Sequence, residues 1–459
     1  MLNRLERYIF YIFLFSIPFQ ARKILYFEGW RFNEWQSISV YATDVLLGVL
    51  FLFWLFGYLA HHKFSIFNFQ FSIKSQLSIF QKPDFYLILF LIISAISIKN
   101  SDSYLISWFQ WIKLVEFSVF YWYLSHYAFK KFGIFNSFTA IMAGGLFQAV
   151  IAIIQFLKQS SIGLKYFGES IVNVDLPGIA SFYLPTGEKI IRAYGTTPHP
   201  NVLAAFFLVS IFCFYFIYFY SRLHSEHEPF ADNWDRFFIV SYAVTLFAFF
   251  TTFSRTIIFI WFFAFCLRSI VVGLVKHYRV IFGTKEGRAR IKVILIASFA
   301  VIVLFGSLYY NEIISRLTID GGDQSVQLRS FYSEEALSGS FNFFGIGIGN
   351  FINWLVERNP YLSAYAYQPV HNIFLLLYSE TGILGLSAFI GFLVFLLKDF
   401  IVGTKLKKSY HFSLLFLFIS VIFIGFFDHL FLTLQQGRLV LWLILGVLTF
   451  YSKGDTIKE

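Results

Sequence analysis

Long uninterrupted runs of apolar residues alternate with shorter polar segments along the whole 459-residue chain. A membrane-spanning helix needs about 20 mostly apolar residues. In lipid, every backbone polar group must be paired within the protein, so only helices and closed barrels can span. The runs here are continuous rather than alternating, which argues against a barrel. The sequence therefore predicts an all-α, polytopic bundle of transmembrane helices that forms a single integral membrane domain over residues 1–459.

The length criterion predicts about twelve spans. The first run follows two arginines and resembles a signal peptide, but no small-residue cleavage site follows it, so we interpret it as a retained helix. The predicted spans are 7–20, 38–60, 84–99, 104–128, 134–157, 199–221, 236–253, 255–273, 291–309, 371–398, 410–428 and 438–452.

The distribution of basic residues predicts the orientation of these spans. Lys and Arg concentrate in the cytoplasmic loops of membrane proteins, and here they are concentrated in the gaps that follow the even-numbered spans. We therefore expect a multi-pass protein of the inner (cytoplasmic) membrane with both termini in the cytoplasm. The two long gaps, 158–198 and 310–370, then face outward, and 310–370 is predicted to be a long extracytoplasmic loop before the tenth span.

Composition agrees with a chain whose main solvent is lipid. Only 14% of the residues are charged and 58% are hydrophobic, whereas soluble domains carry roughly 25% charged residues. The formal net charge of +10 does not indicate a nucleic-acid partner, because no basic domain lies outside the spans. The two cysteines, Cys213 and Cys266, lie inside apolar runs, form no metal-ligand spacing and do not favour a disulfide framework.

Two outer turns carry arginines. Arg192 begins a segment with one glycine and two prolines that ends at Asn201, and this composition predicts a turn. Either Asn201 simply caps the next helix, or Arg192 and His199 meet an anionic head group. Arg255 lies in a very short turn between two spans. A charge at membrane depth usually faces the bundle interior or a cavity, so an anion site is favoured there over snorkelling to the interface.

The long outer loop and the tenth span hold the other candidates. Arg329 precedes a glycine-rich run at 344–351, which lacks the dinucleotide-binding spacing and instead predicts a close backbone approach. His371 opens the tenth span, and histidine can act as a general base near neutral pH. Asn372 either orients that ring or caps the helix. Glu380 lies about 14 Å further along the axis and cannot touch His371.

Polar residues inside and between other spans have structural alternatives. Lys113 and Glu116 lie three residues apart in the fourth span and are interpreted as an intramembrane ion pair, with a proton relay as the alternative. A last outer turn gathers five polar residues, which either line the same cavity or cap two helices. These five residues are Asp428, His429, Gln435, Gln436 and Arg438.

Together these segments resemble the O-antigen ligase family. The resemblance rests on Gly-Thr-Thr-Pro-His-Pro-Asn-Val-Leu-Ala (195–204), Phe-Ser-Arg-Thr (253–256), Leu-Arg-Ser (328–330), Phe-Gly-Ile-Gly-Ile-Gly-Asn-Phe (344–351) and His-Asn-Ile-Phe-Leu with Ser-Glu-Thr-Gly-Ile-Leu-Gly (371–385). Their order, the long outer loop and the number of spans resemble the family along nearly the whole chain.

The resemblance implies a membrane glycosyltransferase that works outside the cytoplasm without a cofactor or metal. Its donor would be a polyprenyl-diphosphate-linked glycan, and its acceptor a lipid, glycan or protein hydroxyl, among membrane lipids. Arg255 and Arg329 would hold the diphosphate, since guanidinium groups suit phosphate oxygens, and His371 would activate the acceptor. His199 receives no role. Supporting roles fall to Arg192, Asn372, Glu380 and Arg438.

Two other functions remain open at this stage. A polymerase that extends one lipid-linked glycan with another would use the same donor chemistry. A polysaccharide or small-molecule transporter would show internal repeats and broken helices near the membrane midplane. No internal repeat is visible, and the polar residues gather at the predicted outer face, which favours an enzyme.

Overall fold

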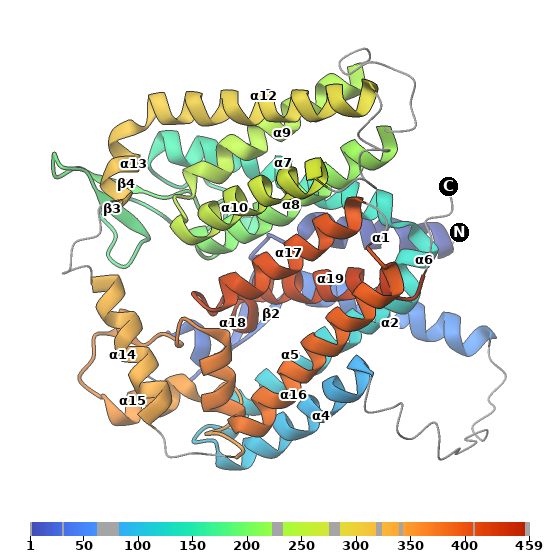
Figure 1. Ribbon diagram of the computed structural model, residues 1–459. Helices are drawn as coiled ribbons and strands as arrows, with labels where there is room; N and C mark the ends of the chain where they lie inside the picture. The colour runs from blue at the N-terminus through green and yellow to red at the C-terminus, as the bar shows by residue number, and fades with distance from the viewer. Residues whose placement is uncertain are drawn as a thin grey trace.

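The structure is a computed structural model that describes residues 2–29, 32–61, 82–222, 233–274, 285–317, 324–338, 343–406 and 409–454. The described chain is mostly helical (Figure 1). Six of its helices are long and apolar enough to cross a membrane: Pro83–Asn100, Ile134–Lys158, Pro200–Tyr218, Asn233–Thr251, Arg288–Leu308 and Ile373–Thr404. Three shorter apolar helices are Ala42–Gly57, Arg255–Leu267 and Tyr410–Gly425.

Every one of the twelve predicted segments contains a helix. They are α1 (Leu2–Ser16), α2 (Ala42–His61), α4 (Pro83–Ser97), α5 (Tyr104–Tyr123), α7 (Ile134–Lys158), α8 (Pro200–Arg222), α9 (Asn233–Thr251), α10 (Arg255–Leu274), α12 (Lys285–Leu308), α16 (Ile373–Thr404), α17 (Ser409–Gly425) and α19 (Gln435–Ser452). A helical, multi-pass architecture is therefore confirmed, while the number of spans stays a prediction, because six of these helices meet the criteria for crossing a membrane.

The second predicted span is wrong at its start. Strand β1 (Arg22–Phe27) pairs antiparallel with β2 (Ser37–Tyr41), so α2 begins only at Ala42. Side chains of β2 alternate between buried and more exposed positions, which is the two-residue period of a strand. A hydropathy window averages over that alternation and merges the strand with the helix that follows. A second small hairpin pairs β3 (Ser181–Tyr183) with β4 (Lys189–Ile191).

The predicted outer loop 310–370 is largely helical where it is described. It contains α13 (Tyr310–Leu317), α14 (Gln324–Ser338) and α15 (Phe351–Arg358). These helices lie at one end of the bundle together with β3, β4 and the short helix α18 (Leu430–Thr433), whereas α1 begins and α19 ends near the opposite end (Figure 1). The loops that hold the candidate site therefore lie at the end of the bundle away from both chain ends.

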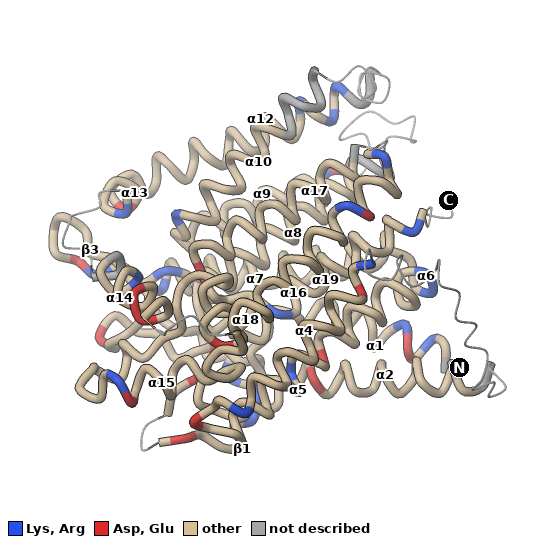
Figure 2. Tube along the Cα trace, turned by 60° about the horizontal axis from the view of Figure 1, so that its bottom comes forward, with Lys and Arg blue, Asp and Glu red and all other residues tan. Residues whose placement is uncertain are grey.

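Burial separates an interior helix from the outer ones. Helix α8 is buried along nearly its whole length and packs against α7, α9, α10, α17 and α19. Helix α12 instead leaves large apolar side chains exposed, such as Ile296 (67%) and Phe299 (69%). The Lys and Arg residues of α12 lie toward its N-terminal end, and its remaining length carries none (Figure 2). A continuous apolar outer face of this kind fits a helix whose surroundings are lipid.

Helix α16 is kinked at Gly382, and the glycine-rich run fills the kink. Gly382 has φ 69° and ψ −174°, a backbone region essentially restricted to glycine. The backbone N–H of Ile346 donates to the Ser379 carbonyl (2.9 Å) and that of Gly347 to the Glu380 carbonyl (3.0 Å). A Cβ on Gly345 would lie 2.3 Å from the Glu380 carbonyl carbon. The predicted close approach of this run is therefore a contact with the α16 backbone.

Candidate functional site

Two histidines and an aspartate meet where α16 and α18 begin. His371 directly precedes the Asn372 cap of α16, and His429 precedes α18. Their rings are in edge contact, with 4.9 Å between centroids and 81° between planes. Tyr332 of α14 stacks on the other side of His371, with centroids 5.9 Å apart. Tyr332 of α14 and His429 next to α18 thus both pack against the imidazole of His371.

Asn201 connects this cluster to the turns that carry arginines. Its side-chain N–H donates to Asp428 (2.7 Å), and its side-chain oxygen accepts from Arg192 (2.6 Å) and from the Ser254 hydroxyl (3.0 Å). Arg192 also donates to the Thr252 carbonyl (2.7 Å). Asn201 therefore lies in the first turn of α8 and joins three turns, one before α8, one before α10 and one before α18.

We call the place where Asn201 joins these three turns the junction. Four arginines lie around it. The Arg255 guanidinium donates to the Arg316 carbonyl (3.3 Å), and the charges of Arg255 and Arg316 both act on Arg192. The charge of Arg329, on α14, acts on His371. Arg192, Arg255 and Arg316 thus form one group, and Arg329 lies on the histidine side. Of the residues predicted to hold a diphosphate, Arg255 and Arg329 lie on two sides of the same junction.

An apolar groove opens beside the first arginine group. It has a volume of about 410 Å³ and lies between α10, α12 and α13. Phe259 and Phe262 of its wall are exposed on the outside of the bundle, where lipid is expected. Arg255 and Arg316 are its two charged lining residues; the others are Phe250, Phe253, Ile258, Phe259, Trp261, Phe262, Ile302, Phe305, Gly306, Ile313 and Leu317.

The buried positions of the two histidines favour their neutral forms. Burial lowers the pKa of His371, and the charge of Arg329 lowers it further, while Asp428 and the Pro369 backbone act in the opposite sense. Burial and the charge of His371 lower the pKa of His429 to about 3. An uncharged imidazole can accept a proton, so His371 has the protonation state that a general base needs at neutral pH.

The two charged groups bound by Asn201 keep their charges at neutral pH. Burial favours the neutral carboxyl of Asp428, but the nearby His429, His371 and His199 outweigh it and lower the pKa of Asp428 overall. Burial lowers the pKa of Arg192 to about 9, and the nearby Arg316 adds to the effect. A guanidinium with that pKa is still protonated at pH 7.

Residues 240–390 match a family described as O-Antigen ligase. This segment carries the O-antigen ligase domain. It spans Arg255, Arg329, His371 and Glu380, whereas Arg192 and Arg438 lie outside it. A search of curated protein sequences finds no match to the chain. The match confirms the resemblance seen in the sequence and supports a membrane enzyme of the O-antigen ligase or polymerase type.

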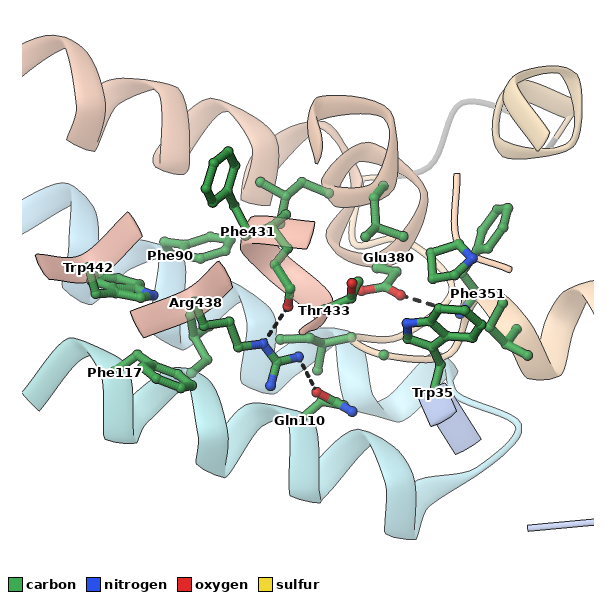
Figure 3. Close-up of a pocket in the computed structure, with 18 residues that line it drawn as sticks. Trp35, Phe90, Gln110, Phe117, Phe351, Glu380, Phe431, Thr433, Arg438 and Trp442 are labelled. Atoms are coloured by element: carbon green, nitrogen blue, oxygen red, sulfur yellow. Dashed lines mark hydrogen bonds between the residues drawn. The ribbon is translucent and has the colours of Figure 1, made fainter. Parts of the chain in front are cut away.

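Not all of the predicted site residues meet at the junction. Asn372 caps α16: its side-chain oxygen accepts from the backbone N–H groups of Phe374 (2.9 Å) and Leu375 (3.1 Å). Glu380 and Arg438 line a second, smaller cavity of about 70 Å³ (Figure 3). Of the two readings of Asn372, capping is the one that the hydrogen bonds support.

Several junction residues were given no role, or no definite role, from sequence. His199 lies beside Asn201, whose backbone N–H donates to its Nδ1 (3.1 Å). Arg316 belongs to no motif that the sequence singled out. The sequence left open whether Asp428 and His429 line a cavity or cap helices, and Asp428 acts as a cap, since it accepts the Leu430 N–H (3.2 Å). No group of three His, Cys, Asp or Glu side chains that could hold a metal ion occurs among the described residues.

Proposed function

We propose that this protein transfers a glycan from a polyprenyl-diphosphate carrier to an acceptor hydroxyl. The observation that carries the proposal is the adjacency of three features: an apolar groove on the outside of the bundle, arginines at its edge, and a neutral histidine across the junction. A lipid-linked diphosphate sugar has the matching parts in the same order, namely an isoprenoid chain, a diphosphate and a sugar.

The groove suits the isoprenoid chain of the donor. Its wall is apolar except for Arg255 and Arg316, so an alkyl chain bound there would place the diphosphate beside two guanidinium groups. Guanidinium groups pair with phosphate oxygens in a fork geometry. Arg192 lies within electrostatic range of both arginines and adds a third positive charge.

Charge development explains why arginines are needed. When the bond between the sugar and the diphosphate breaks, negative charge grows on the leaving phosphate oxygen. Preorganised positive groups at that position usually make the largest contribution to lowering a barrier. Arg255, Arg316 and Arg329 are the groups proposed to stabilise the leaving diphosphate, and no metal ion is required for this step.

His371 is proposed as the general base. Its ring takes the proton of the acceptor hydroxyl while the acceptor oxygen forms a bond to the anomeric carbon and the lipid diphosphate leaves. Positioned general bases contribute roughly 10²- to 10⁴-fold. The Asp428 carboxylate interacts with the charges of the histidines, so it stabilises the imidazolium that forms. The acceptor is a lipid, glycan or protein hydroxyl.

The site is proposed to face outward from the cytoplasmic membrane, with both termini in the cytoplasm. The loops that build the junction lie at the end of the bundle away from the start of α1 and the end of α19 (Figure 1). Basic residues concentrate in the gaps that follow the even-numbered predicted spans, as expected for cytoplasmic loops. Cysteine accessibility labelling from each side of intact cells tests this orientation.

The test of function uses purified protein in lipid nanodiscs with a lipid-diphosphate-linked repeat unit. His371→Ala should lower transfer by 10²-fold or more, and Arg255→Lys should lower it because lysine offers a point charge without the fork. His126→Ala, at the other end of the bundle, and Arg358→Lys, on α15, are the matched controls. Wild-type rates in both site variants would refute the assignment.

The products of the same assay separate the two related activities. A single transfer to an added lipid or protein acceptor identifies a ligase. Long ladders in the absence of added acceptor identify a polymerase, which uses the same donor chemistry. Transport of the intact donor across the bilayer without bond cleavage would contradict both.

A further inference from the structure

The second cavity is lined by Trp35 and Thr433, both of which contact His429. Its volume of about 70 Å³ has room for a few water molecules, since each needs roughly 10–15 Å³ of such volume. Its lining includes the ionisable groups of Glu380 and Arg438, the hydroxyl of Thr433 and the side-chain amide of Gln110. A cavity of this size with several polar partners is suited to water rather than to a sugar ring.

An unpaired donor points to water in this cavity. Trp35 lines it, and its indole Nε1 is buried without a hydrogen-bond partner among the described residues. The Trp35 indole, the Glu380 carboxylate and Thr433 surround the same space (Figure 3). A buried donor without a partner is unfavourable, and an ordered water that bridges Trp35 to the other polar groups removes that penalty.

A hydrogen bond connects the cavity to His429, which is in ring contact with the proposed base His371. His429, in ring contact with His371, has its Nδ1 2.6 Å from the Thr433 hydroxyl oxygen. Trp35 also packs edge-on against His429, with 5.6 Å between ring centroids. Thr433 therefore touches His429 on one side and the cavity on the other, and a hydroxyl can accept one proton while it donates another.

We propose that His429, Thr433 and water in this cavity form a proton path between the histidine pair and Glu380. The inference rests on the proposed function, because it concerns the proton that the acceptor hydroxyl gives up. That proton passes from the histidine pair to the Thr433 hydroxyl, which gives its own proton to cavity water, and water protonates the Glu380 carboxylate. After the lipid diphosphate has left the sugar, the proton returns by the same path to the diphosphate or to bulk water.

The surroundings of Glu380 allow it to store a proton. The charged group that faces it is Arg438 of α19, and the backbone N–H groups of Gly349 and Phe351 point to its carboxylate. Arg438 is itself held by the Leu432 carbonyl and by the Gln110 side chain (2.6 Å). In the proposed path, water in the cavity is therefore the neighbour that exchanges a proton with the Glu380 carboxylate.

Variants of the path separate proton transfer from structure. Glu380→Gln keeps an oxygen for the Phe351 N–H (3.4 Å) but cannot take up a proton as a carboxylate does. Thr433→Val keeps the volume and removes the hydroxyl. Thr381→Val is the matched control, because the Thr381 hydroxyl donates to the Leu377 carbonyl (2.7 Å) within α16.

The kinetic test measures kcat and the donor KM of these variants in H2O and in D2O. Glu380→Gln and Thr433→Val should each lower kcat by about tenfold or more, change the solvent isotope effect on kcat and leave the donor KM within twofold. Thr381→Val should match the wild type. Wild-type kcat and isotope effects in both path variants would overturn the proposal.

A second measurement does not depend on activity. A cryo-EM map at a resolution that shows water should contain ordered density between Trp35 Nε1 and the Glu380 carboxylate. A dry cavity would overturn the path even if the variants were slow. If wild-type protein transferred no glycan, the proposed function would fail, whereas the water density would still decide whether this cavity can conduct a proton.

Discussion

Replacing Asn201 by Leu should both destabilise the end of the bundle that holds the candidate site and disable the site. The substitution keeps the approximate volume but removes three hydrogen bonds, to Arg192, Asp428 and Ser254. Two of these partners are charged, and leaving each without this bond costs about 1–3 kcal/mol. Arg192 keeps its bond to Thr252 and Asp428 keeps the Leu430 N–H. The expected loss is therefore about 2–6 kcal/mol.

The assay combines thermal unfolding in detergent with glycan transfer. Asn201→Leu should lower both the melting temperature and the transfer rate, since Arg192 and Asp428 lose their common anchor. Asn173→Ala is the control: the exposed Asn173 side chain accepts a single N–H from Asp175 at 3.3 Å, so its loss should be within about 0.5 kcal/mol. Equal melting temperatures and rates for Asn201→Leu and Asn173→Ala would refute the view that Asn201 joins the two halves of the site.

Three further outcomes follow from other parts of the structure. Gly382→Ala should cost about 1–3 kcal/mol in backbone strain, and more from its Cβ, which would lie 2.3 Å from the Phe343 carbonyl; Gly48→Ala, in open helical space, should be neutral or slightly stabilising by unfolding assay. Because the pKa of His371 is lowered, the neutral base persists to a more acidic pH than in a free histidine. The fall of kcat/KM on the acidic side should therefore have its midpoint below about pH 6.5. A midpoint at or above that value would contradict the assignment of His371 as the base. Inorganic diphosphate should inhibit competitively with the donor, and Arg255→Lys should raise its inhibition constant, whereas equal constants would argue against diphosphate binding there.

The helices were predictable because their physical cause is local. Continuous apolar runs long enough to span a bilayer must be helical, and the predicted span 134–157 differs from α7 (Ile134–Lys158) by one residue. The β1–β2 hairpin was missed because its pairing joins residues 22–27 to residues 37–41. Its outward side chains, such as Leu25 (59% exposed), give the segment a hydropathy close to that of a helix end.

The candidate site was predictable in its residue types but not in its pairing. Arginines and a histidine at helix ends near a membrane surface stand out because such charges are costly there. The bond between Asn201 and Asp428 joins positions 227 residues apart, and no local pattern encodes it. His199 was given no role, although its place in the same turn as Asn201 was a usable signal. Glu380 was expected to lie away from His371, and it lines a different cavity.

The polarity of the junction follows from which helix ends meet there. Helices α8 and α10 both begin at it, at Pro200 and Arg255, and a helix N-terminus carries roughly half a positive charge. The positive charge of these two helix ends adds to that of the arginines. The Asp428 carboxylate, which accepts a hydrogen bond from Asn201, carries the opposing negative charge. Burial, rather than this positive charge, is the main cause of the lowered pKa of His371, because Asp428 raises the pKa more than Arg329 lowers it. The positive charge of the arginines and helix ends therefore attracts an anionic donor, whereas burial of the imidazole keeps the base in its proton-accepting form. Diphosphate binding and base catalysis thus depend on two different properties of the same junction.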